Sequence, residues 1–159
     1  MECAISPARH EDAQRIASLS ARLIEAGLPK SWSAWRVERF IRRRDSVVLT
    51  ARVDEKFVGF AIMRFADETA HLNLLAVAPE SQRRGIGRRL IGWLEESAIV
   101  AGTFTVSLEV RADNADALRF YAALGYHETD VISGYYNGIV DAALLARDLR
   151  VCKTDLEYD

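Results

Sequence analysis

The middle of the chain combines two glycines with three arginines in the segment Gln82-Arg83-Arg84-Gly85-Ile86-Gly87-Arg88. Glycines carry no side chain that would hold a ligand away from the backbone, so several amide N–H groups can converge on one anion. A helix that starts here adds about half a positive charge at its N-terminus, and the arginine side chains add more. These residue types at this spacing predict a binding site for a pyrophosphate.

Two other phosphate motifs do not fit the same segment. A P-loop requires Gly-Lys-Ser/Thr after four intervening residues, and the dinucleotide fingerprint requires a third glycine where Leu90 stands. A structural alternative stays open, in which Gly85 and Gly87 only form a tight turn and the arginines only form the solvated start of a helix. The local sequence does not decide between this alternative and an anion site.

The elements that flank the segment would present it at the end of a strand. The apolar run Leu72 to Ala78 predicts a strand that Pro79 ends. A helix from about Gly85 to Ala101 and a strand from about Thr105 to Arg111 follow, and the helix has an apolar stripe at i+4 steps, formed by Ile86, Leu90, Leu94 and Ala98. A strand, a long helix and a strand in this order predict a parallel, right-handed crossover.

The remaining segments predict a mixed α/β fold. Its central sheet is expected to be mostly antiparallel, with one parallel strand pair and about four helices. The expected further elements are a strand at Cys3–Ser6, a helix at His10–Ala26, a second helix capped by Ser31 or Ser33, a hairpin of Ser46–Val53 and Phe57–Phe65, a helix capped by Asp113 or Asn114 that ends at Gly125, and strands at Tyr126–Ile132 and Ile139–Leu149.

Composition sets further bounds. With 159 residues, half of them apolar, and no repeat or linker, we expect a single domain over residues 1–159. The formal charge of −2 gives no overall attraction to nucleic acid or to a membrane surface, although arginines cluster locally at Arg42–Arg44 and Arg83–Arg89. No signal peptide and no membrane span is expected. The protein is therefore predicted to be soluble and unprocessed.

Cysteine and histidine usage predicts neither a disulfide framework nor a metal site. Cys3 and Cys152 stand at opposite ends of the chain and lack the spacing of a zinc site or a disulfide framework, which predicts a protein of the reducing cytoplasm. His10, His71 and His127 are scattered without the spacing of metal ligands. We therefore expect no metal cofactor.

The central segment carries a family resemblance. Gln82 to Gly87 matches the Q/R-x-x-G-x-G/A signature of the GNAT acetyltransferase superfamily, and Leu75-Ala76-Val77-Ala78-Pro79 precedes it at the right distance. The resemblance extends from Leu72 to Leu149, about half the chain. Its second half resembles the RimI-type ribosomal-protein alanine N-acetyltransferases in Leu108–Asn114, Ala117, Phe120-Tyr121, Leu124-Gly125-Tyr126, Gly134-Tyr135-Tyr136 and Asp141-Ala142.

This resemblance implies the GNAT acyl-CoA N-acyltransferase fold and acetyl-CoA as cosubstrate. Backbone groups of Leu75, Ala76 and Val77 would hold the thioester and the pantetheine arm, next to a strand bulge at Leu74–Ala76 that would free an N–H for the thioester carbonyl. Asn114 would contact the cofactor arm. The pyrophosphate would be bound by Arg83, Arg84, Gly85, Ile86, Gly87 and Arg88.

The resemblance also implies a catalytic pair, with Glu109 as general base, through water, and Tyr121 as general acid. Each has a structural alternative: Glu109 could pair with Arg111, and Tyr121 could pack beside Leu118 and Leu124. His71 could instead relay a proton. Tyr135 and Tyr136 could line the acceptor cleft.

The expected reaction is transfer of acetyl to a primary amine by direct attack, without a protein nucleophile. Only a neutral amine attacks a thioester, and an α-amine of pKa about 8 loses its proton more readily than a lysine near 10.4. The resemblance makes the N-terminal alanine of a ribosomal protein the first acceptor to consider, before a protein lysine or a small-molecule amine. A noncatalytic acyl-CoA sensor or a partner-binding module is the alternative from another class. Residues Glu11 to Arg44 carry no motif that identifies the acceptor, and nothing in the sequence predicts the oligomeric state.

Overall fold

The computed structural model describes residues 2–150 and divides into two compact units. The first unit includes residues 2–64 and 72–96, and the second includes residues 65–71 and 97–150. Three elements, β3 (Lys56–Ala66), β4 (Thr69–Val77) and α3 (Ile86–Val100), pass from one unit to the other. The single domain expected over residues 1–159 stays a prediction, and Cys152 lies outside the described residues.

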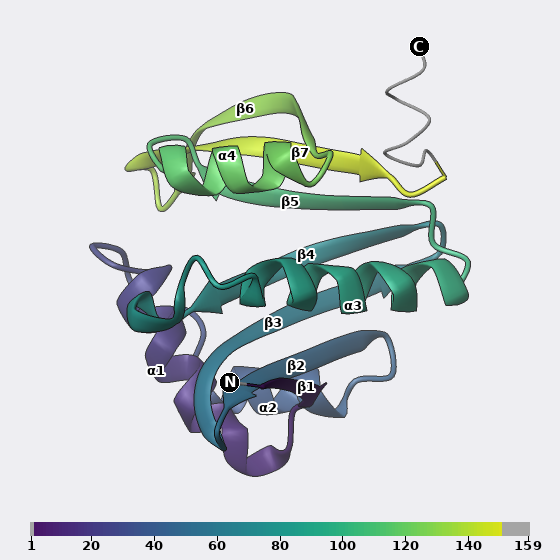
Figure 1. Ribbon diagram of the computed structural model, residues 1–159. Coiled ribbons are helices and arrows are strands. Elements are labelled where there is room, and N and C mark those ends of the chain that lie inside the picture. Colours follow the sequence, from purple (N-terminus) through teal and green to yellow (C-terminus); the bar gives the residue numbers. More distant parts are fainter. Residues whose placement is uncertain (1, 151–159) are drawn as a thin grey trace. The chain divides into compact units, whose positions relative to one another are not determined.

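Antiparallel strands form the sheet of the first unit (Figure 1). The strand order is β1 (Cys3–Pro7), β2 (Ser46–Val53), β3 and β4. The tight turn between β2 and β3 is formed by Asp54 and Glu55, whose φ angles are 52° and 66°. Short acidic side chains such as aspartate tolerate this left-handed region better than branched ones do. The predicted hairpin is therefore confirmed.

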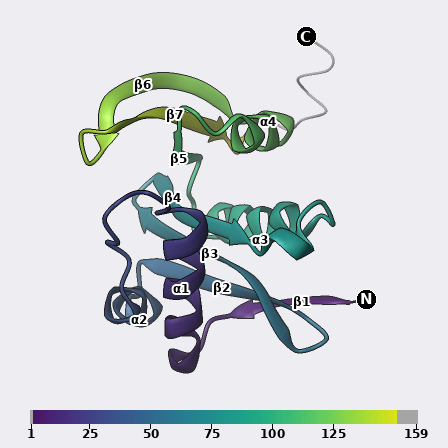
Figure 2. The same cartoon turned by 90° about the vertical axis from the view of Figure 1, so that its left-hand side faces the viewer.

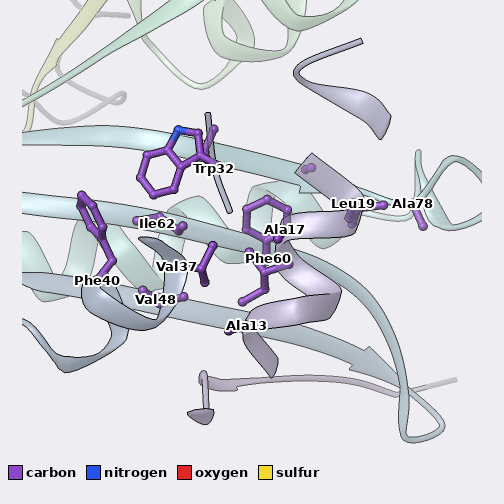
Figure 3. Packing of buried hydrophobic residues seen from close by; sticks show 13 residues of the cluster. Ala13, Ala17, Leu19, Trp32, Val37, Phe40, Val48, Phe60, Ile62 and Ala78 are labelled. Carbon is purple, nitrogen blue, oxygen red and sulfur yellow. The ribbon is translucent and has the colours of Figure 1, made fainter. Parts of the chain in front are cut away.

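Helices cover both faces of the β2–β4 part of this sheet. In Figure 2, α1 (Ala13–Leu23) and α2 (Ala34–Arg42) lie on one side of these strands, and α3 lies on the other. The apolar stripe predicted for α3 is buried, with Ile86 3% exposed and Leu90, Leu94 and Ala98 fully buried. Under α1 and α2 the core contains Trp32, Val37 and Phe40 from the helical side and Val48, Phe60 and Ile62 from the strands (Figure 3).

The second unit contains β5 (Thr105–Arg111), α4 (Ala115–Ala123), β6 (His127–Tyr136) and β7 (Val140–Asp148). Strand β7 pairs antiparallel with β5 on one side and with β6 on the other. The start of β4 lies beside β5: the carbonyl of Glu68 accepts from the N–H of Phe104 at 2.8 Å, and the His71 ring lies 3.3 Å from the Ser107 hydroxyl. These contacts advance in the same direction along both segments, which confirms the predicted parallel pair.

Helix starts follow the predicted caps. The Ser33 hydroxyl accepts from the N–H of Arg36 at 3.2 Å at the start of α2, and the Asn114 side chain accepts from the N–H of Ala117 at 3.1 Å at the start of α4. Each bond satisfies an N–H that has no acceptor within its helix. The alternatives left open by sequence, Ser31 or Ser33 and Asp113 or Asn114, are thereby resolved.

Two predicted boundaries were wrong. The first α-helix is Ala13–Leu23 rather than His10–Ala26. At its start, a 3-10 turn takes the place of the first predicted residues. Beyond its end, the buried carboxylate of Glu25 accepts from the N–H of Trp32 at 3.2 Å and holds the loop that follows the helix. Strand β6 continues to Tyr136 instead of ending at Ile132. Its Gly134 has φ 63° and donates its N–H to Asp141 at 2.8 Å, so the glycine bends the strand without ending it. Among the described residues, no helix is long and apolar enough to cross a bilayer.

Candidate active site

The strand that leads to the glycine-rich segment is held by hydrogen bonds at its end. The N–H of Ala78 donates to the carbonyl of Val58 at 2.7 Å, and the side-chain amide of Gln82 donates to the carbonyl of Val77 at 2.9 Å. A single 3-10 turn at Pro79–Ser81 connects the two segments. The glutamine of the signature therefore ties the turn back to β4, which fixes where the turn begins.

The turn itself uses left-handed backbone conformations. Arg83 has φ 64° and Gly85 has φ 81°, and α3 begins immediately afterwards at the buried Ile86. Gly85 is exposed, and a Cβ built on it would meet no atom within 4 Å. The first N–H groups of an α-helix have no acceptor inside the helix, so those that follow Gly85 remain available to an anion. The turn is therefore open at the place where the sequence predicts that a pyrophosphate binds.

The arginines near the turn have different surroundings. Arg89 donates from Nη1 to the carbonyl of Cys3 at 2.7 Å and thereby ties α3 to β1. Arg83, Arg84 and Arg88 are exposed. These three are the arginines that the sequence assigns to the pyrophosphate, and this assignment stays a prediction. The other basic cluster has acidic neighbours, since Arg43 donates to Asp45 at 2.8 and 2.9 Å.

Gly59 on β3 lies against the strand segment that includes Leu75, Ala76 and Val77. A Cβ built on Gly59 would lie 2.8 Å from the carbonyl oxygen of Ala76 and 3.4 Å from Val77 Cα. Such a contact cannot form without moving backbone. Glycine at this position therefore allows β3 to approach β4 closely where the thioester is expected to bind.

We expect Gly59→Ala to lower the melting temperature by about 2–4 °C, which corresponds to about 1 kcal/mol in a chain of this size, and to weaken acetyl-CoA binding at least about threefold. Thermal unfolding and calorimetric titration measure the two effects. Gly92→Ala is the matched control because its Cβ would meet no atom within 4 Å and it lies within α3. Equal melting temperatures and equal affinities for Gly59→Ala and the wild type would contradict the close approach of β3.

In the second unit, β5 alternates between buried and partly exposed residues. Val106, Leu108 and Val110 are buried, whereas Ser107 and Glu109 lie on the opposite face. Glu109 Oε2 lies 2.7 Å from His71 Nε2, and His71 Nδ1 lies 3.3 Å from Ser107 Oγ. The carboxylate predicted to be the base thus contacts the histidine that the sequence offered only as an alternative.

Tyr121, the predicted acid, is buried on α4 within an aromatic cluster. Its ring centroid lies 5.0 Å from that of Phe120 and 5.6 Å from that of Tyr126, both at edge-on angles. Burial raises the pKa of Tyr121 above the ordinary value, and the nearby Tyr136 phenol raises it further. Tyr121 therefore carries its proton at neutral pH, as a general acid must.

Tyr136 connects Tyr121 to Glu109 electrostatically. Burial raises the pKa of Tyr136 to about 12, and Tyr135 and Glu109 add to the increase. The pKa of Tyr135 is also raised, first by burial and then by the negative charge of Glu109. Within the second unit, the charge of Glu109 therefore raises the pKa values of Tyr135 and Tyr136, and Tyr136 raises that of Tyr121.

The raised pKa of Tyr136 predicts that stability falls in alkali. Because the folded-state pKa of about 12 exceeds the ordinary value of about 10, the contribution of this phenol to stability is complete below pH 10. It is lost as pH rises from about 10 to about 12. Denaturant unfolding across this range should show a shallower loss for Tyr136→Phe than for the wild type. Parallel pH profiles for the two proteins would show that Tyr136 titrates ordinarily.

The structure thus divides the predicted residues between the units. Leu75, Ala76, Val77 and the turn belong to the first unit, whereas Glu109, Asn114 and Tyr121 belong to the second. Asn114 uses its side-chain oxygen as the cap of α4, and its proposed contact with the cofactor arm stays a prediction.

Sequence reasoning missed Ser107. The signal that could have found it was its position two residues before Glu109, on the same face of the strand. Within residues 2–150, no three His, Cys, Asp or Glu side chains gather as metal ligands.

Comparison with known proteins defines the class. The sequence model of the acetyltransferase (GNAT) family matches residues 12–126. The chain belongs to the GNAT acetyltransferase family, and it is an acetyl-CoA-dependent N-acetyltransferase.

Individual relatives show which members of the family this chain resembles. The chain is 33% identical over 132 residues to the [ribosomal protein bS18]-alanine N-acetyltransferase of Salmonella typhimurium, an alignment that covers 75% of this chain and 89% of the relative. It superposes on the crystal structure of the ribosomal-protein-S18-alanine N-acetyltransferase from Escherichia coli with a TM-score of 0.79 at 27% identity, covering 95% and 96% of the two chains. PaiA N-acetyltransferase from Thermoplasma acidophilum, solved with coenzyme A, has the same fold, with a TM-score of 0.79 at 21% identity and coverage of 93% and 99%. The predicted GNAT fold and the RimI-type resemblance are confirmed.

Proposed function

We propose that this enzyme acetylates the N-terminal α-amine of a protein, with the N-terminal alanine of a ribosomal protein as its acceptor. The observation that carries the proposal is the similarity to the Salmonella alanine N-acetyltransferase over 89% of that protein's length. The second unit adds support, because it contains a partly exposed carboxylate, Glu109, and a protonated phenol, Tyr121, the two residue types that this chemistry uses. The site is proposed to work in the cytoplasm, without nucleic acid or membrane as partner.

Acetyl-CoA would be held by backbone and arginine together. Leu75, Ala76 and Val77 would offer their backbone groups to the thioester and the pantetheine arm, and Asn114 would contact the arm. The pyrophosphate would accept from the amides of Gly85, Ile86 and Gly87 and from the guanidinium groups of Arg83, Arg84 and Arg88. The exposed, left-handed Gly85 supports this assignment because it leaves the start of α3 open.

Glu109 and Tyr121 would divide the proton transfers. Glu109 takes a proton from the acceptor ammonium group, through water, and the neutral amine then attacks the thioester carbonyl carbon. A C–N bond forms and the C–S bond breaks through a tetrahedral oxyanion. Tyr121 gives its proton to the departing thiolate, whose pKa resembles the value near 8.5 of cysteine. The nitrogen of the intermediate gives its second proton to the Tyr121 phenolate, and Glu109 releases its proton to solvent, so both groups return to their starting states. The products are an acetylated amine, coenzyme A as the free thiol, and one proton.

We expect Glu109→Gln to reduce turnover most at low pH. Glutamine keeps the shape of the side chain but cannot accept the proton, so the variant depends on acceptor that is already neutral. Below the acceptor pKa of about 8, the ratio of wild-type to variant kcat/KM should fall by about tenfold for each unit by which the pH rises. Profiles of kcat/KM against pH, recorded for both proteins with a peptide that begins with alanine, measure this ratio. A loss of the same size at every pH would exclude Glu109 as the base.

Acceptor choice is tested by coenzyme A release with three matched substrates. One peptide begins with alanine and has a free α-amine, the second is the same peptide with that amine blocked and one lysine added, and the third is a small amine. We expect turnover with the first and a rate at least about 100-fold lower with the others. Faster turnover with lysine or the small amine would reassign the acceptor. Tight acetyl-CoA binding without turnover of any of the three would favour a sensor.

A further inference from the structure

A hydrogen-bonded chain links Ser107, His71 and Glu109 in the second unit, and we propose that it positions the carboxylate of Glu109 for catalysis. The links are the 3.3 Å contact between Ser107 Oγ and His71 Nδ1 and the 2.7 Å contact between His71 Nε2 and Glu109 Oε2. This inference rests on the proposed function, in which Glu109 is the base. His71 and Ser107 act through Glu109 and are positioning residues.

When His71 is neutral, the chemistry of the three groups fixes where the protons lie. An ionised carboxylate only accepts hydrogen bonds, so Nε2 of His71 must carry the proton in the contact with Glu109. A neutral imidazole has one donor and one acceptor nitrogen, which makes Nδ1 the acceptor. Ser107 then donates its hydroxyl to Nδ1. One arrangement satisfies all three groups while Glu109 is ionised and His71 is neutral, which is the state required of a general base.

Backbone pairing holds the Ser107–His71–Glu109 hydrogen-bond chain in place. Phe104 and Thr105 at the start of β5 both donate to the carbonyl of Glu68, at 2.8 and 3.3 Å, which sets His71 beside the face of β5 that includes Ser107 and Glu109. The side chain of Glu109 is 17% exposed and that of His71 is 34% exposed. The pair is therefore partly shielded, yet open enough for a substrate amine or a bridging water to reach the carboxylate.

Restricting a glutamate in this way contributes to the rate. A free glutamate side chain samples several rotamers, and the entropy of ordering it is already lost in the folded protein when the histidine holds Oε2. We assign the other carboxylate oxygen, Oε1, to the acceptor amine. Tyr135 and Tyr136 are the ionisable neighbours whose pKa values respond to the charge of Glu109, and both are neutral in the working pH range.

The kinetic test compares His71→Leu with His71→Gln. Leucine removes the donor, whereas the amide nitrogen of glutamine can replace Nε2 as a donor to Glu109. We expect kcat with the alanine-starting peptide to fall about 10- to 100-fold in His71→Leu and to recover to within about threefold of the wild type in His71→Gln, with KM for acetyl-CoA unchanged. The double variant His71→Leu/Glu109→Gln should be no slower than Glu109→Gln alone, because both substitutions remove the same function, the action of Glu109 as base.

Additive losses in the double variant, or wild-type kcat in His71→Leu, would overturn the positioning role. The ¹⁵N spectrum of labelled histidine tests the chain independently of turnover. At about pH 8.5, where histidine is ordinarily neutral, His71 should show a protonated Nε2 and an unprotonated Nδ1, and Ser107→Ala should weaken this preference. A protonated Nδ1 in the wild type would overturn the inference. A correct spectrum together with no turnover of any amine would instead count against the proposed function alone.

Discussion

Replacing Gly85 by aspartate should weaken acetyl-CoA binding by at least about 100-fold, equivalent to about 2.7 kcal/mol. The new carboxylate would stand beside the first amides of α3, where it would compete with the pyrophosphate for N–H groups and repel its charge. Space does not oppose the substitution, since a Cβ at Gly85 meets no atom within 4 Å. Isothermal titration with acetyl-CoA measures the affinity directly.

Two controls separate charge from backbone strain. Gly85→Asn has nearly the same shape as Gly85→Asp and the same left-handed backbone to adopt at φ 81°, but no charge, so it should lose less than about tenfold in affinity. Gly102→Asp places the same side chain at φ 83°, also without a neighbour within 4 Å, beyond the end of α3, and should bind as the wild type does. Equal losses for Asp and Asn at position 85 would mean that strain, rather than an anion site, explains the effect.

Tyr121→Phe should lower kcat by about 100-fold and leave the affinity for acetyl-CoA unchanged. The substitution removes only the hydroxyl, so the edge-on ring contacts with Phe120 and Tyr126 remain. The thiolate would then leave without a proton donor. Single-turnover rates with the alanine-starting peptide isolate this step from product release.

Tyr126→Phe is the matched control for Tyr121→Phe. Tyr126 is buried in the same aromatic cluster, and its ring centroid lies 5.6 Å from that of Tyr121, but no catalytic role is assigned to it. Its kcat should stay within about threefold of the wild type. If the two variants lose the same activity, the hydroxyl of Tyr121 serves packing and hydrogen bonding rather than proton transfer.

Local patterns predicted most of the elements because each depends on neighbours in sequence. The i+4 stripe of α3, the alternation of β5, and the caps at Ser33 and Asn114 follow from periodicity and from N–H groups without acceptors. The early end of the first helix did not follow from such patterns. It depends on the buried carboxylate of Glu25, whose partner Trp32 lies seven residues along the chain.

The candidate site was predictable to the extent that it forms a motif. Gln82 to Arg88 carries a signature, and the resemblance pointed to Glu109 and Tyr121. The link from Glu109 to His71 joins two parallel segments 38 positions apart in the numbering, and no spacing rule encodes it. Its recognition requires the register of Glu68 against Phe104, which is a property of the folded sheet.

The most direct test of the central claim uses one peptide that begins with alanine and also contains an internal lysine. After incubation with the enzyme and acetyl-CoA, fragmentation mass spectrometry locates the added acetyl group. The account predicts one acetyl group on the alanine α-amine, formed in step with coenzyme A release and lost in Gly85→Asp. Acetylation of the lysine with an unmodified N-terminus would contradict it.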